Sequence, residues 1–106
     1  NIITGWDTKR LEANLNYNLQ SFQLSEPYPN PFNPATNIII NQHETALVKL
    51  AIYDIKGREI AILYNDIMYP GKSSFTWNAT IYPTGIYFLK AISGDQIQVK
   101  KIFLIK

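Results

Sequence analysis

Hydrophobic and polar residues alternate with a period of two over much of the chain after residue 35, which is typical of strands with one buried face. Residues 47–54 show the clearest alternation, with aliphatic side chains at every second position from Val48 to Ile52. Similar short apolar runs predict further strands at residues 36–42, 58–65, 72–78, 86–93 and 96–105. No segment shows a convincing helical period, so the pattern predicts an all-β protein.

Turn signals separate these runs at short intervals. Gly57 offers the positive φ that a tight hairpin requires, and Pro70-Gly71 suits the two central positions of a turn. Two more breaks, at residues 83–85 and 94–95, complete a series of hairpin-length connections. We therefore expect an antiparallel immunoglobulin-like, or fibronectin-III-like, β-sandwich of about seven strands, without the Cys-Trp-Cys framework of antibody domains.

The alternating positions also predict which residues form the core. Large apolar side chains at period two on the most regular strands should point between the sheets. The expected core residues are Val48, Leu50, Ile52, Phe75, Trp77 and Phe88.

The first part of the chain differs from the rest. Residues 1–21 are polar and rich in Asn, with irregularly spaced apolar positions such as Trp6 and Leu11, and we interpret them as a linker or lead-in from a preceding domain. Residues 26–34 contain four prolines, which exclude a helix and predict a stiff double corner. The expected domain therefore covers residues 22–106.

Composition narrows the function classes. The 106 residues include seven Tyr, five Phe and two Trp, which suits a sheet protein. A net charge of +2 from scattered Lys and Arg gives no basic stripe for nucleic acid. The lack of Cys excludes disulfides and thiolate metal sites. No apolar run is long enough to predict membrane insertion, and a start without Met or a signal peptide suggests a piece of a longer precursor.

The chemistry-bearing residues predict neither catalysis nor a cofactor. His43 is the only histidine and has no nucleophile motif around it, so we interpret it as an exposed strand-end residue. Asp54 and Glu59 flank the Gly57 turn, where charges are usually solvated. Asn65-Asp66 and Gly94-Asp95 lack the clustered carboxylates of a calcium site. We predict a protein that is not an enzyme and holds no metal.

An aromatic-rich sandwich also allows a carbohydrate-binding function, because exposed aromatic rings can form sugar platforms. Trp6, Tyr64, Tyr69 and Tyr82 are the candidates for exposed rings. Scattered surface aromatics are common and need no function. An accessory carbohydrate-binding or structural module of a secreted enzyme is the alternative hypothesis.

From Leu24 onward the sequence resembles the type A C-terminal sorting domain of type IX secretion substrates. Residues 24–38, LSEPYPNPFNPATNI, are similar to the opening Y-P-N-P-F-N-P-x-T-x-I, and residues 48–60, VKLAIYDIKGREI, to V-x-L-x-V-Y-D-x-x-G-R-x-V. Residues 75–78 and 83–88 match the W-[ND] and S-G-[IV]-Y-[FY] segments, with Thr84 as a departure. Residues 100–106 resemble the basic, then apolar, terminus. A related Ig-like domain occurs in flagellar hook-capping proteins.

The resemblance implies a secretion signal. A covalently linked N-terminal passenger would precede this domain, which would be recognised in the periplasm by the outer-membrane translocon and by shuttle and sortase components of the type IX system. The passenger would finish in the medium or at the cell surface. Nucleic acid and membrane insertion have no part in this hypothesis.

The resemblance also predicts two groups of important residues. The structural motif positions are Pro29, Asn30, Pro31, Phe32, Asn33, Pro34, Gly57, Arg58, Trp77, Gly85 and Tyr87. The expected partner-recognition residues form the final segment, Lys100, Lys101, Ile102, Phe103, Leu104, Ile105 and Lys106. The Lys pair is the informative feature, because packing does not require two charges within a strand, and an edge strand is accessible to a partner.

Overall fold

A computed structural model describes residues 22–106, and the expected linker at residues 1–21 lies outside the described part. Seven strands and no helix are present in that part. The strands are β1 (Phe22–Leu24), β2 (Ala35–Gln42), β3 (Ala46–Tyr53), β4 (Glu59–Met68), β5 (Gly71–Asn78), β6 (Gly85–Ser93) and β7 (Gln96–Leu104).

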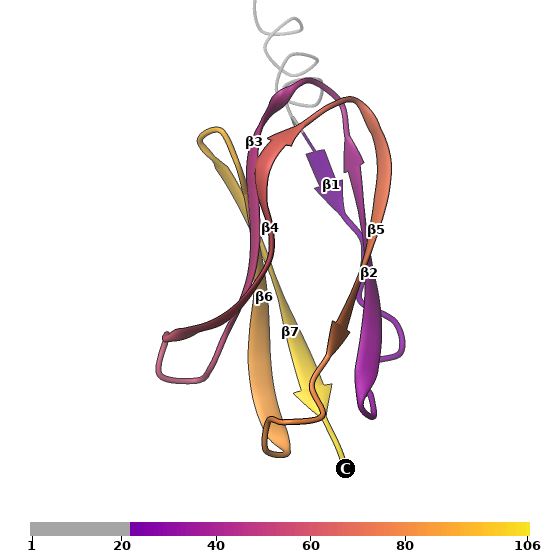
Figure 1. The fold of residues 1–106 in the computed structure, drawn as a ribbon, viewed down its shortest axis with the longest axis vertical. Helices are drawn as coiled ribbons and strands as arrows, with labels where there is room; N and C mark the ends of the chain where they lie inside the picture. Colours follow the sequence, from indigo (N-terminus) through magenta and orange to yellow (C-terminus); the bar gives the residue numbers. More distant parts are fainter. Residues whose placement is uncertain (1–21) are drawn as a thin grey trace, which may run out of the picture.

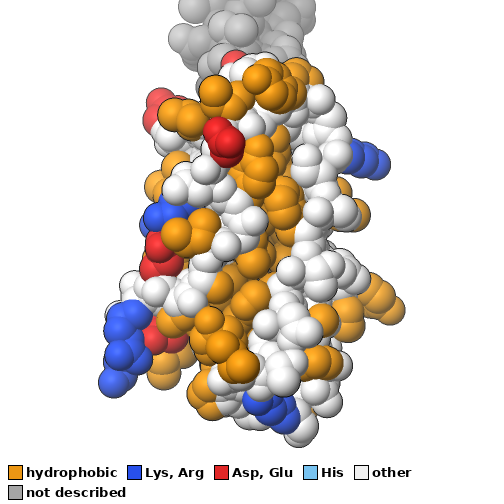
Figure 2. Space-filling model, in the orientation of Figure 1, with side chains coloured by type: hydrophobic (Ala, Val, Ile, Leu, Met, Phe, Trp, Pro, Cys, Tyr) orange, Lys and Arg blue, Asp and Glu red, His pale blue; other side chains and the backbone are white. Residues whose placement is uncertain are grey.

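The strands form two antiparallel sheets that face each other as two layers (Figure 1). One sheet has three strands in the order β1-β2-β5, and the other has four in the order β4-β3-β6-β7. The prediction of an all-β sandwich of about seven strands is confirmed. In Figure 2 an apolar band runs along the long axis between the layers, and separate acidic and basic side chains lie beside it.

The core lies between the inner faces of the two sheets. Val48, Leu50 and Ile52 of β3 are each buried, as their alternation predicted. Ile38 and Ile40 of β2 approach them from the other sheet. Trp77 on β5 is only 3% exposed, which confirms its place in the core, whereas Phe75 is half-buried at the margin.

The prediction that Phe88 lies in the core is wrong. The buried positions of β6 are Tyr87, Leu89 and Ala91, so Phe88 points to the outer face of the sheet and is half-buried there. The reason is pairing register. Phe88 lies opposite Tyr53 of β3, which alternates out of phase with the buried β3 residues, and a shift by one residue would expose the whole inner set of β6.

Strand β4 departs from simple alternation because it contains two register shifts. Along β3 the partners step from Tyr64 to Ile62 and from Ala61 to Glu59. Each step leaves one extra residue on β4, as in a β-bulge. Simple alternation would put Ile60 and Ile62 on one face, but Ile60 packs against the core whereas Ile62 is 51% exposed.

The ends of the sandwich are different, and the motif residues gather at one of them. Figure 1 shows that the C-terminus lies at the same end as the β3–β4 turn and the β5–β6 connection, while β1 begins at the opposite end. We call the end that holds the C-terminus the base. The base therefore brings together segments that are far apart in sequence.

Candidate functional site

Strand β7 contains most of the predicted recognition residues and lies at the edge of the four-stranded sheet, paired with β6. The backbone N–H and C=O of Phe103 bond outside that pairing. Because antiparallel partners alternate between bonded and non-bonded pairs, the backbone groups of Ile97, Val99 and Lys101 point away from β6 as well. This row of groups is the open edge of β7.

The proline-rich corner covers the lower half of that edge. The Phe32 N–H donates to the Phe103 carbonyl at 2.9 Å, and the Ile105 N–H donates to the Phe32 carbonyl at 3.0 Å. The Asn30 side-chain amide extends the contact, because its Oδ1 accepts from the Phe103 N–H and its Nδ2 donates to the Lys101 carbonyl. A strand-adding partner would find this half of the edge already occupied.

The corner itself is held from two directions. The buried Thr36 hydroxyl donates to the Pro29 carbonyl at 2.8 Å, and the Ala79 N–H donates to the Pro34 carbonyl at 2.8 Å. The Phe32 ring is buried, whereas Pro31 and Asn33 are exposed. The motif thus works as a clamp that attaches β2 to the end of β7.

The adjacent lysines of β7 have different environments. Lys100 lies on the inner side of the strand, and its Nζ pairs with Glu26 at 2.8 Å. Lys101 points outward, is exposed, and its Nζ lies 5.6 Å from the centroid of the Phe103 ring. No acidic partner of Lys101 is present among residues 22–106. Lys101 is therefore the cation of the pair that remains accessible.

The rest of the final segment also alternates. Ile102 and Leu104 are buried in the core, while Phe103 and Ile105 are exposed on the outer side. The Lys106 ammonium donates to the Thr80 carbonyl at 2.7 Å, which ties the chain end to the β5–β6 connection. Only the outward half of the predicted recognition set is thus available to a partner of the folded domain.

An aromatic cluster lies behind the corner. The Trp77 ring contacts the rings of Phe32, Tyr82 and Tyr87, with centroid distances of 5.3 to 5.6 Å. The Tyr87 hydroxyl donates to the Pro83 carbonyl at 2.6 Å, and burial raises the pKa of that phenol. Gly85 has an ordinary φ and open space around it, so no backbone strain requires glycine there. Trp77 and Tyr87 are therefore buried in the aromatic packing of the base.

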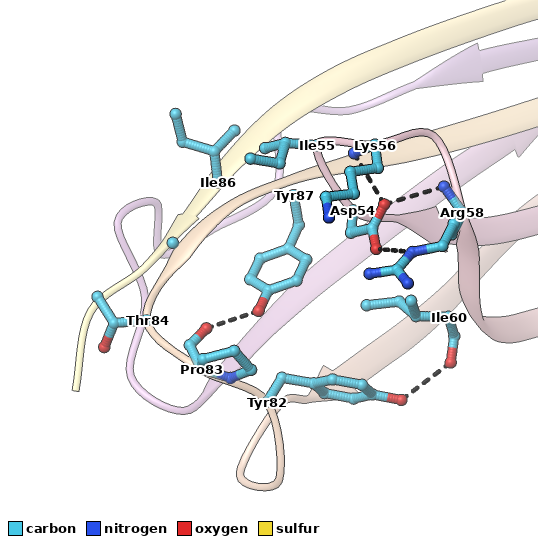
Figure 3. A pocket seen from close by; sticks show the side chains of 11 residues that line it. Asp54, Ile55, Lys56, Arg58, Ile60, Tyr82, Pro83, Thr84, Ile86 and Tyr87 are labelled. Atoms are coloured by element: carbon cyan, nitrogen blue, oxygen red, sulfur yellow. Dashed lines mark hydrogen bonds and ion pairs between the residues drawn. The ribbon is translucent and has the colours of Figure 1, made fainter.

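The β3–β4 turn is organised by Asp54. One carboxylate oxygen accepts from the backbone N–H groups of Lys56 and Arg58, and the other accepts from Arg58 Nε at 2.8 Å (Figure 3). These bonds, led by the one from the Arg58 backbone, hold the pKa of Asp54 below its ordinary value. Gly57 adopts a φ of 83°, as predicted for this turn. The D-x-x-G-R string is a turn motif here.

A cavity of about 350 Å³ lies between this turn and residues 82–87. Ile55, Ile60 and Ile86 contribute apolar walls, and Figure 3 shows the tyrosine hydroxyls already bonded to backbone carbonyls. The Asp54 carboxylate is committed to its own turn. The tyrosine hydroxyls and the Asp54 carboxylate at this cavity are therefore all engaged in bonds within the domain.

The motif residues thus lie in one connected arrangement of corner, final strand, turn and aromatic cluster, and a family comparison covers all of it. The family described as "Secretion system C-terminal sorting domain" matches residues 26–106. The chain belongs to this family. The resemblance to a type IX sorting domain that the sequence indicated is confirmed.

Solved structures resemble the sorting domain at low sequence identity. The crystal structure of dimeric latent PorU from Porphyromonas gingivalis aligns with 79% of the chain at a TM-score of 0.57 and 16% identity. The chain spans 9% of that PorU chain, so this likeness shows the fold alone. An alkylpurine DNA glycosylase, AlkC, from Pseudomonas fluorescens aligns with 81% of the chain and 31% of its own, at a TM-score of 0.46 and 11% identity. No curated protein matches the chain.

The remaining candidates from the sequence are scattered over the sorting domain. His43 is exposed, and residues 22–106 contain no group of His, Cys, Asp and Glu that could hold a metal ion. Tyr64 and Tyr82 are half-buried against the core, Tyr69 is 68% exposed, and Trp6 lies outside the described residues. No helix in the described part is long and apolar enough to cross a membrane.

Gln98 has a role that sequence reasoning missed. Its Oε1 accepts from the Leu24 N–H and its Nε2 donates to the Phe22 carbonyl, each at 3.0 Å. The side chain thereby satisfies the free edge of β1 and joins the two sheets. Its inward position on an apolar strand was a signal that a polar partner was needed, but sequence alone did not identify β1 as that partner.

Proposed function

We propose that this chain is a non-catalytic type IX secretion signal that carries a covalently linked N-terminal passenger from the periplasm to the cell surface or medium. The family match over residues 26–106 is the observation that carries the proposal, because it spans both sheets and every motif of the base. The outer-membrane translocon, with its shuttle and sortase components, is the proposed partner.

We assign recognition to the outward residues of the final segment. Lys101, Phe103 and Ile105 are exposed at the edge of the sheet, and the clamp formed by Asn30 and Phe32 holds them in a fixed position. Ile102 and Leu104 support this surface from the core. Lys100 contributes through its ion pair with Glu26.

Export of a reporter tests the proposal. Residues 1–106 would be fused behind a periplasmic reporter in a host with a type IX system, and the reporter would be measured inside and outside the cell. We expect the reporter in the medium or on the surface, and retention in a host without the translocon. Equal retention in both hosts would contradict the secretion function, and retardation of the domain in polysaccharide gels would favour the carbohydrate-binding alternative.

A single substitution tests the assignment to the final strand. Lys101→Glu should reduce export while the melting temperature stays within a few degrees of that of the parent domain, because the side chain is exposed. Lys72→Glu, an exposed lysine on β5, is the matched control. Normal export of Lys101→Glu would remove Lys101 from the recognition surface.

A further inference from the structure

The outer face of the four-stranded sheet is unusually apolar for a surface. Its outward positions on β6 and β7 are occupied mainly by Ile, Val and Phe, and Ile97 and Val99 are 56% and 51% exposed. Ile62 on β4 and Ile86 on β6 continue the surface. Adjacent exposed apolar residues of this kind indicate an interaction site in a water-soluble domain. We call the outward residues of β3, β4, β6 and β7 the outer face.

The charges on the outer face are unbalanced. The four strands contain two acidic residues. Asp66 is exposed but lies opposite the buried Val48, so it does not alternate with the outward positions. Glu59 is paired with Lys49 at 2.6 Å. Two other lysines have no acidic partner among residues 22–106: Lys90 lies 5.4 Å from the Tyr53 ring centroid, and Lys101 lies over Phe103. The outer face is therefore apolar with two available cations held above aromatic rings.

The apolar residues and free lysines of the outer face help to decide which kind of molecule can bind it. Two symmetric copies would bring the same cationic surface together, with Glu59 already paired within each copy. A membrane surface typically needs a cluster of about 4–8 basic residues. Addition of a strand to β7 is limited because Asn30 and Phe32 occupy the lower half of its edge. A protein surface with apolar residues and carboxylates fits the outer face without these conflicts.

We infer that the outer face docks a partner protein whose contact surface is apolar and carries carboxylates opposite Lys90 and Lys101. The inference rests on the proposed function, because the partner is taken to belong to the export route. It adds residues of β6 and β3, including Lys90 and Tyr53, to a recognition site that sequence motifs placed on the final strand alone. The partner contacts side chains on the outer face of the sheet, and the corner occupies the lower half of the backbone edge of β7.

Charge reversal on β6 separates this inference from the function itself. In the reporter fusion of residues 1–106, Lys90→Glu should lower export at least about tenfold, because like charges opposed in an interface cost several kcal/mol. Lys72→Glu makes the same charge change on the opposite side of the sandwich and should export normally. Circular dichroism should show both variants folded, with melting temperatures close to that of the parent fusion.

An apolar pair provides the second variant set. Val99→Ser on the outer face should lower export, whereas Ile39→Ser should not, although Ile39 is similarly exposed on the outward side of β2. If the unmodified fusion is not exported, the proposed function fails and this inference fails with it. If the unmodified fusion is exported and both Lys90→Glu and Val99→Ser are exported equally well, the inference alone is overturned.

Two measurements on the purified domain test whether a second copy or a membrane binds the outer face. Sedimentation equilibrium should show a monomer, and vesicles of phosphatidylcholine with phosphatidylglycerol should not retain the domain. A dimer that dissociates in Val99→Ser, or vesicle binding that is lost in Lys90→Glu, would overturn the inference that a different protein binds the outer face. Selection for restored export of Lys90→Glu should yield Asp or Glu to Lys changes on an export protein, and suppressors confined to the sorting domain would contradict a carboxylate partner.

Discussion

The outer surfaces of the two sheets differ sharply, although both sheets bury similar apolar residues between them. On the three-stranded sheet the outward positions are mainly Asn, Gln, Ser, Thr and Lys, and Ile39 is the large apolar exception. On the four-stranded sheet they are mainly aliphatic and aromatic, with three lysines and one carboxylate. The same fold therefore presents one polar outer surface and one apolar outer surface.

This difference teaches that folding alone does not explain the outer face. Burial between the sheets stabilises both layers, but outward apolar residues add little to that and favour association. The polar surface of β2 and β5 shows that this sandwich folds with Asn37 and Thr76 at such positions, where their side chains bond to each other at 2.8 Å. The docking that we infer for the outer face accounts for these apolar residues.

The largest expected effect on stability comes from a substitution in the core, which lies between the two sheets. Trp77→Ala should lower the free energy of unfolding by about 3–5 kcal/mol, because it removes a buried ring that contacts three other aromatic rings. Chemical denaturation followed by circular dichroism measures the change. If Trp77→Ala cost no more than Ile39→Ala on the exposed side of β2, the assignment of Trp77 to a common core would be wrong.

A smaller loss of stability should follow when the Gln98 side chain no longer joins β7 to β1. Gln98→Leu would leave the Leu24 N–H and the Phe22 carbonyl without their present partner and should cost about 1–3 kcal/mol. Hydrogen exchange should locate the damage, with faster exchange of the Leu24 amide and little change in β3. Gln23→Leu, which is exposed on β1, is the control. Equal exchange at Leu24 in both variants would show that Gln98 does not hold β1.

Much of the fold was predictable because the decisive signals are local. Alternation placed Val48, Leu50 and Ile52 correctly, and Gly57 marked its hairpin since it adopts a positive φ. Strand β6 shows the limit. Its two faces are both apolar enough to be buried, so only pairing with β3 decides that Leu89 faces inward and Phe88 outward. The bulges of β4 depend on the same long-range pairing.

The candidate site was predictable in part for the same reason. The motifs identified the corner and the final strand, but the sequence contained no sign that the Asn30 amide would bond to Phe103 and Lys101, 73 and 71 residues away. The sequence also did not show which of Lys100 and Lys101 would be accessible to a partner. Their difference arises because one faces Glu26 across the sheets and the other faces solvent.

Substitutions on the two outer surfaces should leave stability nearly unchanged. They therefore allow the apolar character of each surface to be compared separately from folding. Val99→Thr and Ile39→Thr should each change the free energy of unfolding by no more than about 0.5 kcal/mol, because both side chains are half exposed. Fluorescence of anilinonaphthalene sulfonate, an apolar anion, should fall for Val99→Thr and stay constant for Ile39→Thr. Similar dye binding by both variants would mean that the surfaces are not different in kind.

The smallest expected effect is a pH dependence that belongs to the four-stranded sheet. The Lys49 ammonium, and next the Tyr53 hydroxyl, hold the pKa of Glu59 below its ordinary value, and β1, β2 and β5 contain no carboxylate. A lowered pKa in the folded state means that the carboxylate stabilises the fold above its unfolded pKa, and that this contribution is lost as the pH falls through the folded pKa. Stability should therefore decline below about pH 4.

Glu59→Gln should reduce that decline, whereas Glu44→Gln, in the exposed connection between β2 and β3, should keep the behaviour of the parent domain. Melting temperatures measured from pH 7 down to about pH 2 give the comparison. The change should be small, because the Lys49–Glu59 pair is about one-third exposed and solvent screens it. Acid also frees Lys49, so the outer face becomes more cationic while the surface of β2 and β5 does not change. A decline of the same steepness in Glu59→Gln as in the parent would show that this pair does not cause the acid sensitivity, and that the two surfaces respond alike to pH.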